Sequence, residues 1–320
     1  MELNMNNLSK TAIALAVTLV TASAAHAAEF NANLELDSTY LNNNRGLSQS
    51  GRVEVNAVGK VGSNYFVAGR ASLLAKKDGA AATDDMWVQL GSSTADLKLG
   101  RFEAADLFRL PRDVLVLYAT GDGVSSVYRA NVLRGRAGSE VFQAAGTVNL
   151  GSGLSFELGA IETRATVGTL PGAAYVAPKG LRPVLSYEQG PWLLRAGLES
   201  IKYNVGGKTR TGFGFTGSYN FSDFTLVGNA AANKDASGNK QTSYALIGDT
   251  KFGLGGGLIF GNTKLPAGSY KVTTAYAAYT FPLFDIKGAT VTPAVSFSKA
   301  GGVNRSNDET GVRVRFNYNF

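Results

Sequence analysis

Charged side chains gather in one stretch of the sequence, residues 102–138, where their types and spacing could act on ions. The stretch carries the acids Glu103, Asp106, Asp113 and Asp122 and the basic residues Arg109, Arg112, Arg129, Arg134 and Arg136. Carboxylates and guanidinium groups on opposite sides of a narrow passage create an electric field that sorts solutes by charge. The stretch is also too long for a turn. We expect it to fold into an interior space and to carry the constriction of a pore.

The sequence lacks the side chains on which most catalytic and metal sites depend. It has no Cys, and its only His, His26, lies within the signal peptide expected at residues 1–27, so the mature chain would have no His. Thiolate metal sites, His-ligated zinc and Ser-His or Cys-His nucleophile pairs are therefore excluded. The net charge of +7 is spread along the chain, without the dense Lys/Arg runs of a nucleic-acid site. We expect no enzyme activity, no cofactor, no metal and no nucleic-acid partner.

The first 27 residues have the pattern of a secretory signal peptide. Lys10 precedes an apolar run from Thr11 to Ala25, and the run ends in the small residues around His26. Such a run is too short for a spanning helix. We expect cleavage after Ala27, which leaves residues 28–320 as the mature chain. No later stretch approaches the roughly 18 consecutive apolar residues of a membrane helix.

The elements that must position the charged stretch are β-strands of alternating character. In TGVRVRFNYNF, at the C-terminus, one parity is apolar or aromatic, and the other carries Arg313, Arg315, Asn317 and Asn319. Side chains alternate faces along a strand, so one face is apolar and the other polar. A barrel in a bilayer turns the first face to lipid and the second to its lumen.

About sixteen strand-like runs can be counted, with short and long connections alternating between them. The runs are 30–41, 52–61, 65–74, 85–91, 96–101, 139–150, 154–164, 181–189, 192–204, 211–221, 224–233, 241–252, 256–264, 270–284, 289–299 and 310–320. Fourteen strands stay possible if the runs between 85 and 101 are not separate. The sequence thus predicts an all-β, transmembrane antiparallel barrel, in which 102–138 is a long third loop folded into the lumen.

Two motifs resemble those of the Gram-negative outer-membrane general diffusion porins. One is the C-terminal strand, which ends on Phe320 with aromatic residues at alternate positions, and the other is LKLGRF at 97–102. The resemblance implies a homotrimer of sixteen-stranded barrels in contact with lipid and lipopolysaccharide. It also implies that the barrel assembly machinery reads Tyr318 and Phe320.

The same resemblance implies where the constriction lies. In that family, acids of the third loop face an arginine cluster on the wall, which here gives Glu103, Asp106 and Asp113 opposite Arg52, Arg70 and Arg101. The loop core LFRLPRDVLVLYA departs from the family by adding Arg109 and Arg112, which favours anions. By parity, Lys60, Arg195, Glu199, Arg313 and Arg315 line the pore. The alternative is that these charges are solvated rim residues without shared geometry.

Aromatic residues have two interpretations. Trp87 and Trp192 could belong to the aromatic girdles at the membrane interfaces. The sharper alternative is a sugar-stacking track in the lumen, for which Tyr118 and Phe108 are the best candidates.

Three functions stay open from the sequence. We expect passive diffusion of small hydrophilic solutes and ions, with a preference for anions. The first alternative is a channel selective for sugars or organic anions, which saturable transport would reveal. The second is a non-conducting barrel for adhesion or envelope anchoring, which the short loops argue against.

Overall fold

The computed structural model describes residues 29–42, 46–117, 127–136, 141–163, 179–202, 209–235, 238–303 and 305–320. The expected signal peptide, residues 1–27, lies outside these described residues, as do Tyr118 and Asp122. Within the described ranges, no helix is long and apolar enough to cross a membrane.

All regular elements of the described chain are β-strands. They are β1 (Glu29–Leu41), β2 (Gly46–Val61), β3 (Tyr65–Lys76), β4 (Ala81–Ser92), β5 (Ala95–Arg101), β6 (Val141–Gly151), β7 (Leu154–Thr163), β8 (Lys179–Gln189), β9 (Trp192–Lys202), β10 (Thr209–Asn220), β11 (Phe224–Lys234), β12 (Lys240–Thr250), β13 (Leu254–Leu265), β14 (Gly268–Tyr279), β15 (Phe281–Pro282), β16 (Ala289–Gly302) and β17 (Arg305–Asn319).

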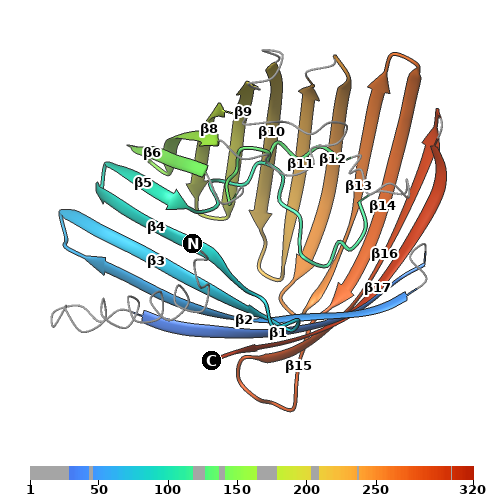
Figure 1. Ribbon diagram of the computed structural model, residues 1–320, viewed down its shortest axis with the longest axis horizontal. Helices are drawn as coiled ribbons and strands as arrows, with labels where there is room; N and C mark the ends of the chain where they lie inside the picture. The colour runs from blue at the N-terminus through green and yellow to red at the C-terminus, as the bar shows by residue number, and fades with distance from the viewer. Residues whose placement is uncertain are drawn as a thin grey trace, which may run out of the picture.

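The strands form a closed antiparallel barrel. Strands that follow one another in the chain pair antiparallel, and β1 also pairs with β17 along its length, which closes the sheet (Figure 1). Seventeen elements are present, but β15 has two residues and pairs with β16, as β14 does, so β14 and β15 are one interrupted strand. The barrel therefore has sixteen strands, as predicted. The alternative of fourteen is wrong, because β4 and β5 are separate paired strands.

Polar and apolar side chains alternate between the two faces, as expected for strands. On β12, Ser243 and Ile247 point inward and are buried, whereas Tyr244 and Leu246 point outward and are 57% and 55% exposed. Exposed apolar residues recur on the outer face of every long strand. A band of this kind on a closed barrel is suited to lipid, because water would not favour so much exposed apolar surface.

The two tryptophans lie on opposite faces. Trp192 is 48% exposed on the outer face, and its ring centroid is 4.5 Å from that of Tyr219, which in turn contacts Phe221. This aromatic row beside the short turns is typical of a membrane-interface girdle. The girdle interpretation is wrong for Trp87, which is partly buried against Phe102 on the inside and lies under the Lys98 ammonium group.

Several strands begin earlier, end later or break where the sequence did not predict it. β2 starts at Gly46 rather than 52, β4 at Ala81 rather than 85, and β17 at Arg305 rather than 310. The predicted run 270–284 is interrupted after Tyr279, before Phe281 and Pro282. Polar strand ends carry no apolar alternation, since they extend beyond the apolar band, and the periodicity of the sequence therefore missed them.

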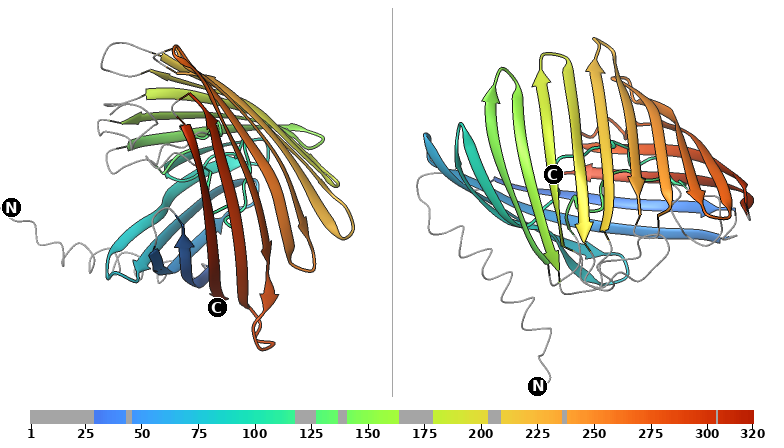
Figure 2. Two further views of the ribbon diagram at one scale, coloured as in Figure 1. Left: turned by 90° about the vertical axis from the view of Figure 1, so that its right-hand side faces the viewer. Right: turned by 90° about the horizontal axis from the view of Figure 1, so that it is seen from above.

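The segment after β5 lies inside the barrel rather than outside it. Its described residues contact inward-facing side chains of strands far apart around the wall, among them Asn229 on β11 and Ser296 on β16. Figure 1 shows its irregular trace running across the concave side of the sheet, and Figure 2 shows the seam where β1 and β2 lie beside β17.

Candidate pore-lining site

Apolar side chains attach the segment to one part of the wall. Leu107, Phe108 and Val127 are buried in a cluster with inward-facing residues of β8 and β11 to β14, such as Val184 and Ile247. Phe108 is only 1% exposed. Its ring therefore offers no free face to a sugar, and the stacking interpretation is wrong for this residue.

Two glycines on β10 make room for this contact. A Cβ atom on Gly214 would lie 2.5 Å from the Ala130 Cβ and 2.7 Å from the Leu107 Cβ. A Cβ atom on Gly212 would overlap the Tyr128 hydroxyl. The segment therefore packs directly on the backbone of β10, and larger side chains at these positions would displace it.

Hydrogen bonds fix the segment at further points. The Arg109 backbone N–H donates to Asn229 Oδ1 at 2.9 Å, and Asn229 Nδ2 donates to the Arg109 carbonyl at 3.0 Å. The Leu115 N–H donates to Ser296 Oγ at 2.9 Å. Arg182 on β8, which is 1% exposed, donates to the Ala105 carbonyl at 2.6 Å. The wall thus satisfies backbone groups that the segment cannot pair internally.

A buried polar contact holds the second half of the segment against β9. The Tyr128 hydroxyl donates to Glu199 Oε1, and the Leu133 N–H donates to Glu199 Oε2 at 3.2 Å. Burial and the charge of Glu199 raise the pKa of Tyr128, so the hydroxyl keeps its proton and remains a donor. The guanidinium of Arg210 lies 5.0 Å from the centroid of the Tyr128 ring.

Ion pairs join the segment to β1 through β4 in one continuous series, which we call the charge chain. Arg112 binds Glu35 on β1 at one end, and Arg136 lies 2.8 Å from Asp85 on β4 near the other. Positive and negative side chains alternate along it in the order Arg112, Glu35, Arg52, Glu54, Arg70, Asp85, Arg136, Glu103, Arg134 and Asp106.

A β-bulge supplies the two acids of β4. Leu73 pairs with Thr83 and Ala71 with Met86, so Ser72 stands opposite both Asp84 and Asp85. Consecutive residues normally point to opposite faces, but a bulge can aim both inward. Both acids are buried, and both bind Arg136, at 3.0 and 2.8 Å. Although burial lowers the pKa of Arg136, its hydrogen bond to Asp85 and the nearby carboxylates raise that pKa above its ordinary value.

Asp113 forms a second ionic contact, with β17. Its Oδ1 lies 2.6 Å from Arg313 and 3.2 Å from Arg315. Arg313 also donates to the Arg112 carbonyl at 2.9 Å. These two wall arginines, which parity assigned to the pore lining, therefore bind the segment directly.

Arg109 and Arg195 are two basic side chains with weak compensation at this site. The Arg109 side chain is exposed and has no ion pair in the part of the chain that the structure describes. Arg195 on β9 has one, with Glu188 at 4.0 Å, and the Glu188 side chain is 73% exposed. The Arg109 and Arg195 charges act on each other. An excess of positive charge therefore faces the interior here.

The structure brings the predicted constriction residues together in a different pairing. The loop acids Glu103 and Asp106 bind Arg134 of the loop itself, rather than the wall arginines that the resemblance implied. Arg52 and Arg70 bind acids of the wall. Arg101 donates to the Asp84 and Arg136 carbonyls at 2.8 Å.

One predicted lining residue is covered rather than open to the interior. Glu199 is 1% exposed, because the loop covers it. Lys60 has the inward parity of β2, as predicted, and its ammonium group lies 4.2 Å from the centroid of the Phe66 ring, beside the short turn at Gly62 and away from the charge chain.

Sequence reasoning missed Glu35, Asp84, Asp85 and Arg182. Glu35 and Arg182 lie on the inward parity of their strands, so the alternation could have found them. The bulge at Asp84 and Asp85 breaks that alternation. Among the described residues, no group of three or more acids could hold a metal ion.

Comparison with known proteins supports the fold. No family model and no curated protein sequence matches the chain. Three solved structures each cover 92% of this chain and 100% of their own chain. An anion-selective porin from Comamonas acidovorans has a TM-score of 0.64 at 17% identity. A trimer form of OmpT, an outer membrane protein of Vibrio cholerae, has 0.64 at 12%, and a mutant of Rh. blastica porin has 0.55 at 17%.

Identities this low show the fold alone, and the fold agrees with the strand count and closure described above. The chain therefore has the sixteen-stranded barrel fold of the porin family, with no subfamily assigned.

Proposed function

We propose that the protein is a porin of a Gram-negative outer membrane, through which small hydrophilic solutes and ions diffuse passively, with a preference for anions. The exposed apolar outer band and the polar inner face support a membrane channel rather than a soluble barrel. The anion-selective porin among the similar structures supports the charge preference. The proposal includes no catalysis.

The balance of charges inside the barrel is the observation that supports the preference for anions. Most inward-facing carboxylates in the charge chain are already paired with arginine, so they attract a passing cation weakly. Arg109 and Arg195 have little or no such pairing. In a confined aqueous passage, surplus guanidinium groups raise the local concentration of anions.

The remaining parts of the proposal concern assembly. We propose that residues 1–27 are removed on export and that the barrels form homotrimers, as the trimer form of OmpT supports. Tyr318 and Phe320, whose ring centroids are 5.3 Å apart, would be the signal for the barrel assembly machinery. Segment 102–138 would be the inward constriction loop.

Single-channel recording in a planar bilayer with a salt gradient tests the function. The refolded mature protein should show conductance steps in groups of three, one step for each pore of a trimer. Its reversal potential should have the anionic sign. Arg109→Glu combined with Arg195→Glu should move that potential toward the cationic sign. Lys251→Glu with Lys287→Glu makes the same charge change at exposed positions on the short turns and should leave it unchanged.

The recordings also separate the alternatives. If a sugar or an organic anion blocks the openings, and the block saturates as the solute concentration rises, the protein would instead be a substrate-selective channel. Silent bilayers from correctly folded protein would contradict conduction and favour a non-conducting structural barrel.

A further inference from the structure

A carboxylate without an ion pair lies on the inner wall, on the short-turn side of the folded-in segment. Asp249, one residue before the end of β12, shares the inward parity of Ile247 and is exposed. Thr225 and Gly255 stand opposite it on the two neighbouring strands, so no basic residue faces it in the register. Among the described residues, Asp249 has no ion pair, and its carboxylate has no hydrogen bond. A carboxylate in this state can bind a passing cationic group.

Two glycines of β13 leave room on the wall beside Asp249. A Cβ atom on Gly255 would lie 2.6 Å from Asp249 Oδ1, and a Cβ atom on Gly257 would lie 3.0 Å from Cε1 of Tyr276. The carboxylate and the Tyr276 ring therefore lie over successive inward positions of one strand. Tyr276 is buried, and its hydroxyl has no hydrogen-bond partner within the described part of the chain. That hydroxyl keeps a donor and an acceptor for a ligand.

The segment places Arg109 and Asp113 at the two edges of this stretch of wall. The Arg109 backbone is bound by Asn229 on β11, and the Asp113 carbonyl accepts a hydrogen bond from Ser296 Oγ on β16 at 3.3 Å. Ser296 stands opposite Tyr276 in the register of β14 and β16. Strands β12, β13 and β14 lie between the two attachments, so the segment frames the side chains that these strands turn inward.

Arg109 and Asp249 carry opposite charges that act on each other without forming an ion pair. The Arg109 charge acts on Asp249, and the charges of Asp249 and Asp113 act on the Tyr276 hydroxyl. Arg195 adds a second positive charge on the Arg109 side. Asp113 is already bound to arginines of β17, whereas Asp249 is not bound to any described base. A molecule that carries both charges can bridge such a gap.

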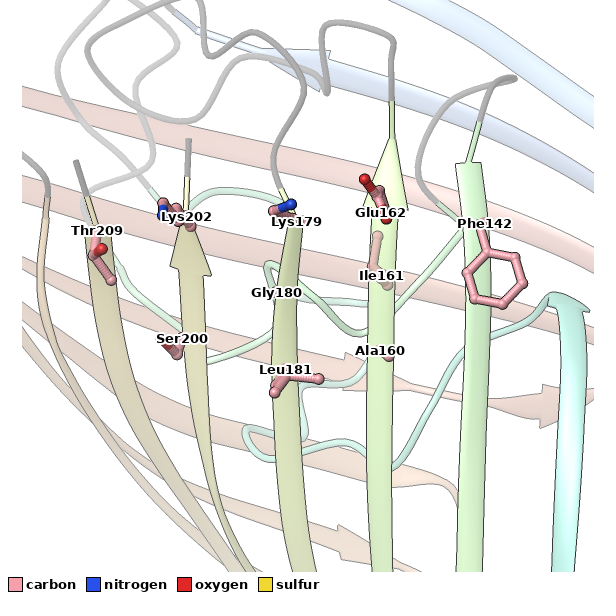
Figure 3. A pocket seen from close by; sticks show the side chains of 10 residues that line it. All are labelled: Phe142, Ala160, Ile161, Glu162, Lys179, Gly180, Leu181, Ser200, Lys202 and Thr209. Carbon is pink, nitrogen blue, oxygen red and sulfur yellow. The ribbon is translucent and has the colours of Figure 1, made fainter. Parts of the chain in front are cut away.

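Charges of both signs also meet in a depression of the outer wall, but there they already face each other. This depression, of about 430 Å³, has Glu162 and Lys179 at the strand ends and Leu181 further along the wall (Figure 3). Glu162 stands directly opposite Lys179 in the register of β7 and β8. These side chains share the outward parity of their strands, so they lie away from a solute in the lumen. Asp249 has no such neighbour and faces the passage.

We propose that Arg109, Asp249 and Tyr276 form a binding site for small zwitterions of the amino-acid type. The solute carboxylate would bind the Arg109 guanidinium, and the solute ammonium group would bind Asp249 and the Tyr276 hydroxyl oxygen. An anion alone leaves Asp249 unpaired, and a cation alone leaves Arg109 unpaired. The inference names a class of solute for the pore and in that respect rests on the proposed function, but binding itself does not require conduction.

Saturation-transfer NMR on the folded protein in deuterated detergent tests the inference. The probes are γ-aminobutyrate, which carries both charges, butyrate, which carries only the carboxylate, and butylamine, which carries only the ammonium group. The dissociation constant of γ-aminobutyrate should be about five-fold lower than that of either other probe, because two charge pairs form instead of one.

Substitutions should act on the probes selectively. Asp249→Asn should raise the dissociation constant of γ-aminobutyrate by about five-fold without weakening butyrate. Arg109→Gln should weaken γ-aminobutyrate and butyrate but not butylamine, and Tyr276→Phe should weaken γ-aminobutyrate by about two-fold. Asp223→Asn in an exposed short turn and Tyr279→Phe on the outward face of β14 are the matched controls and should bind like the wild type. Misfolding would weaken all three probes alike.

Three outcomes would overturn the inference. They are equal dissociation constants for the three probes, binding of butylamine as tight as that of γ-aminobutyrate, and equal affinity for γ-aminobutyrate in the Asp249 and Asp223 variants. The second would mean that Asp249 binds cations without help from Arg109. Selective binding by a protein that is silent in bilayers would contradict the proposed conduction and support the site. Conduction by a protein that does not distinguish the probes would contradict the site alone.

Discussion

At the scale of single residues, Asp113 shows how one carboxylate serves two purposes. It binds Arg313 and Arg315, so it attaches the segment to β17, and it also cancels positive charge at the interior surface. Isolated exposed ion pairs contribute little to stability. This carboxylate is only 14% exposed, so its field is screened less than that of a surface acid.

Asp113→Asn therefore has an expected electrical effect. Arg315 loses its ion pair and Arg313 keeps only the one with Asp37, at 3.6 Å. We expect the anion-to-cation permeability ratio to rise by about two-fold, most clearly at low salt, where the Debye length is long. Reversal potentials at two ionic strengths measure the ratio. Asp223→Asn, in an exposed short turn, makes the same charge change away from Arg313. An unchanged ratio in the Asp113 variant would mean that its carboxylate does not act on permeating ions.

At the scale of elements, β10 is shaped by the segment that packs on it. Its inward positions include Gly212 and Gly214, while Phe213 and Phe215 face outward. Glycine usually weakens a strand interior, but here it permits close approach of Leu107, Tyr128 and Ala130. The fit of the loop is thus a property of strand and loop together.

Gly214→Val should push the segment away from β10. Overpacking of this kind costs about 1–3 kcal/mol, and we expect a displaced loop, noisier openings and an altered single-channel conductance. Gly228→Val, on the outer face of β11, is the control, since a Cβ there has no atom within 4 Å. Conductance that matches the control in the Gly214 variant would show that the segment does not narrow the passage.

At the scale of the whole molecule, the outer wall has two unlike sectors. Exposed lysines lie on the outward face of the sector from β8 to β14, whereas the outward face of β1 to β3 is uncharged and carries the small residues Gly59 and Gly69. The lysines are Lys179, Lys202, Lys234, Lys240, Lys264 and Lys271. An uncharged face suits contact with another barrel better than contact with charged lipid headgroups. We expect the homotrimer to form through this sector.

Gly59→Phe tests this expectation. A Cβ on Gly59 has no atom within 4 Å, so the barrel itself should tolerate the larger side chain. The bulk would instead obstruct a neighbouring subunit, and light scattering in detergent should show monomers. Gly228→Phe adds the same bulk on β11 and should remain trimeric. Trimers from both variants would place the interface elsewhere.

The sequence by itself determined the barrel. Alternation with a period of two, short and long turns in sequence, and Arg313 and Arg315 on the polar parity predicted about sixteen strands, with fourteen left open, and the inward parity of most lining residues. These are local signals, since each depends on neighbours along one strand. Strand ends such as Gly46 and Ala81 were missed because they lie beyond the apolar band.

Only the tertiary structure decided which charges meet. Glu103 and Asp106 bind Arg134 rather than Arg52 or Arg70, and the bulge turns both Asp84 and Asp85 inward. Parity places a residue on a face but does not set its height or its partner across the lumen. Those depend on the register of sixteen strands and on the path of a segment with no periodic pattern. Pairing inside the barrel is therefore a property of the closed wall and the folded loop together.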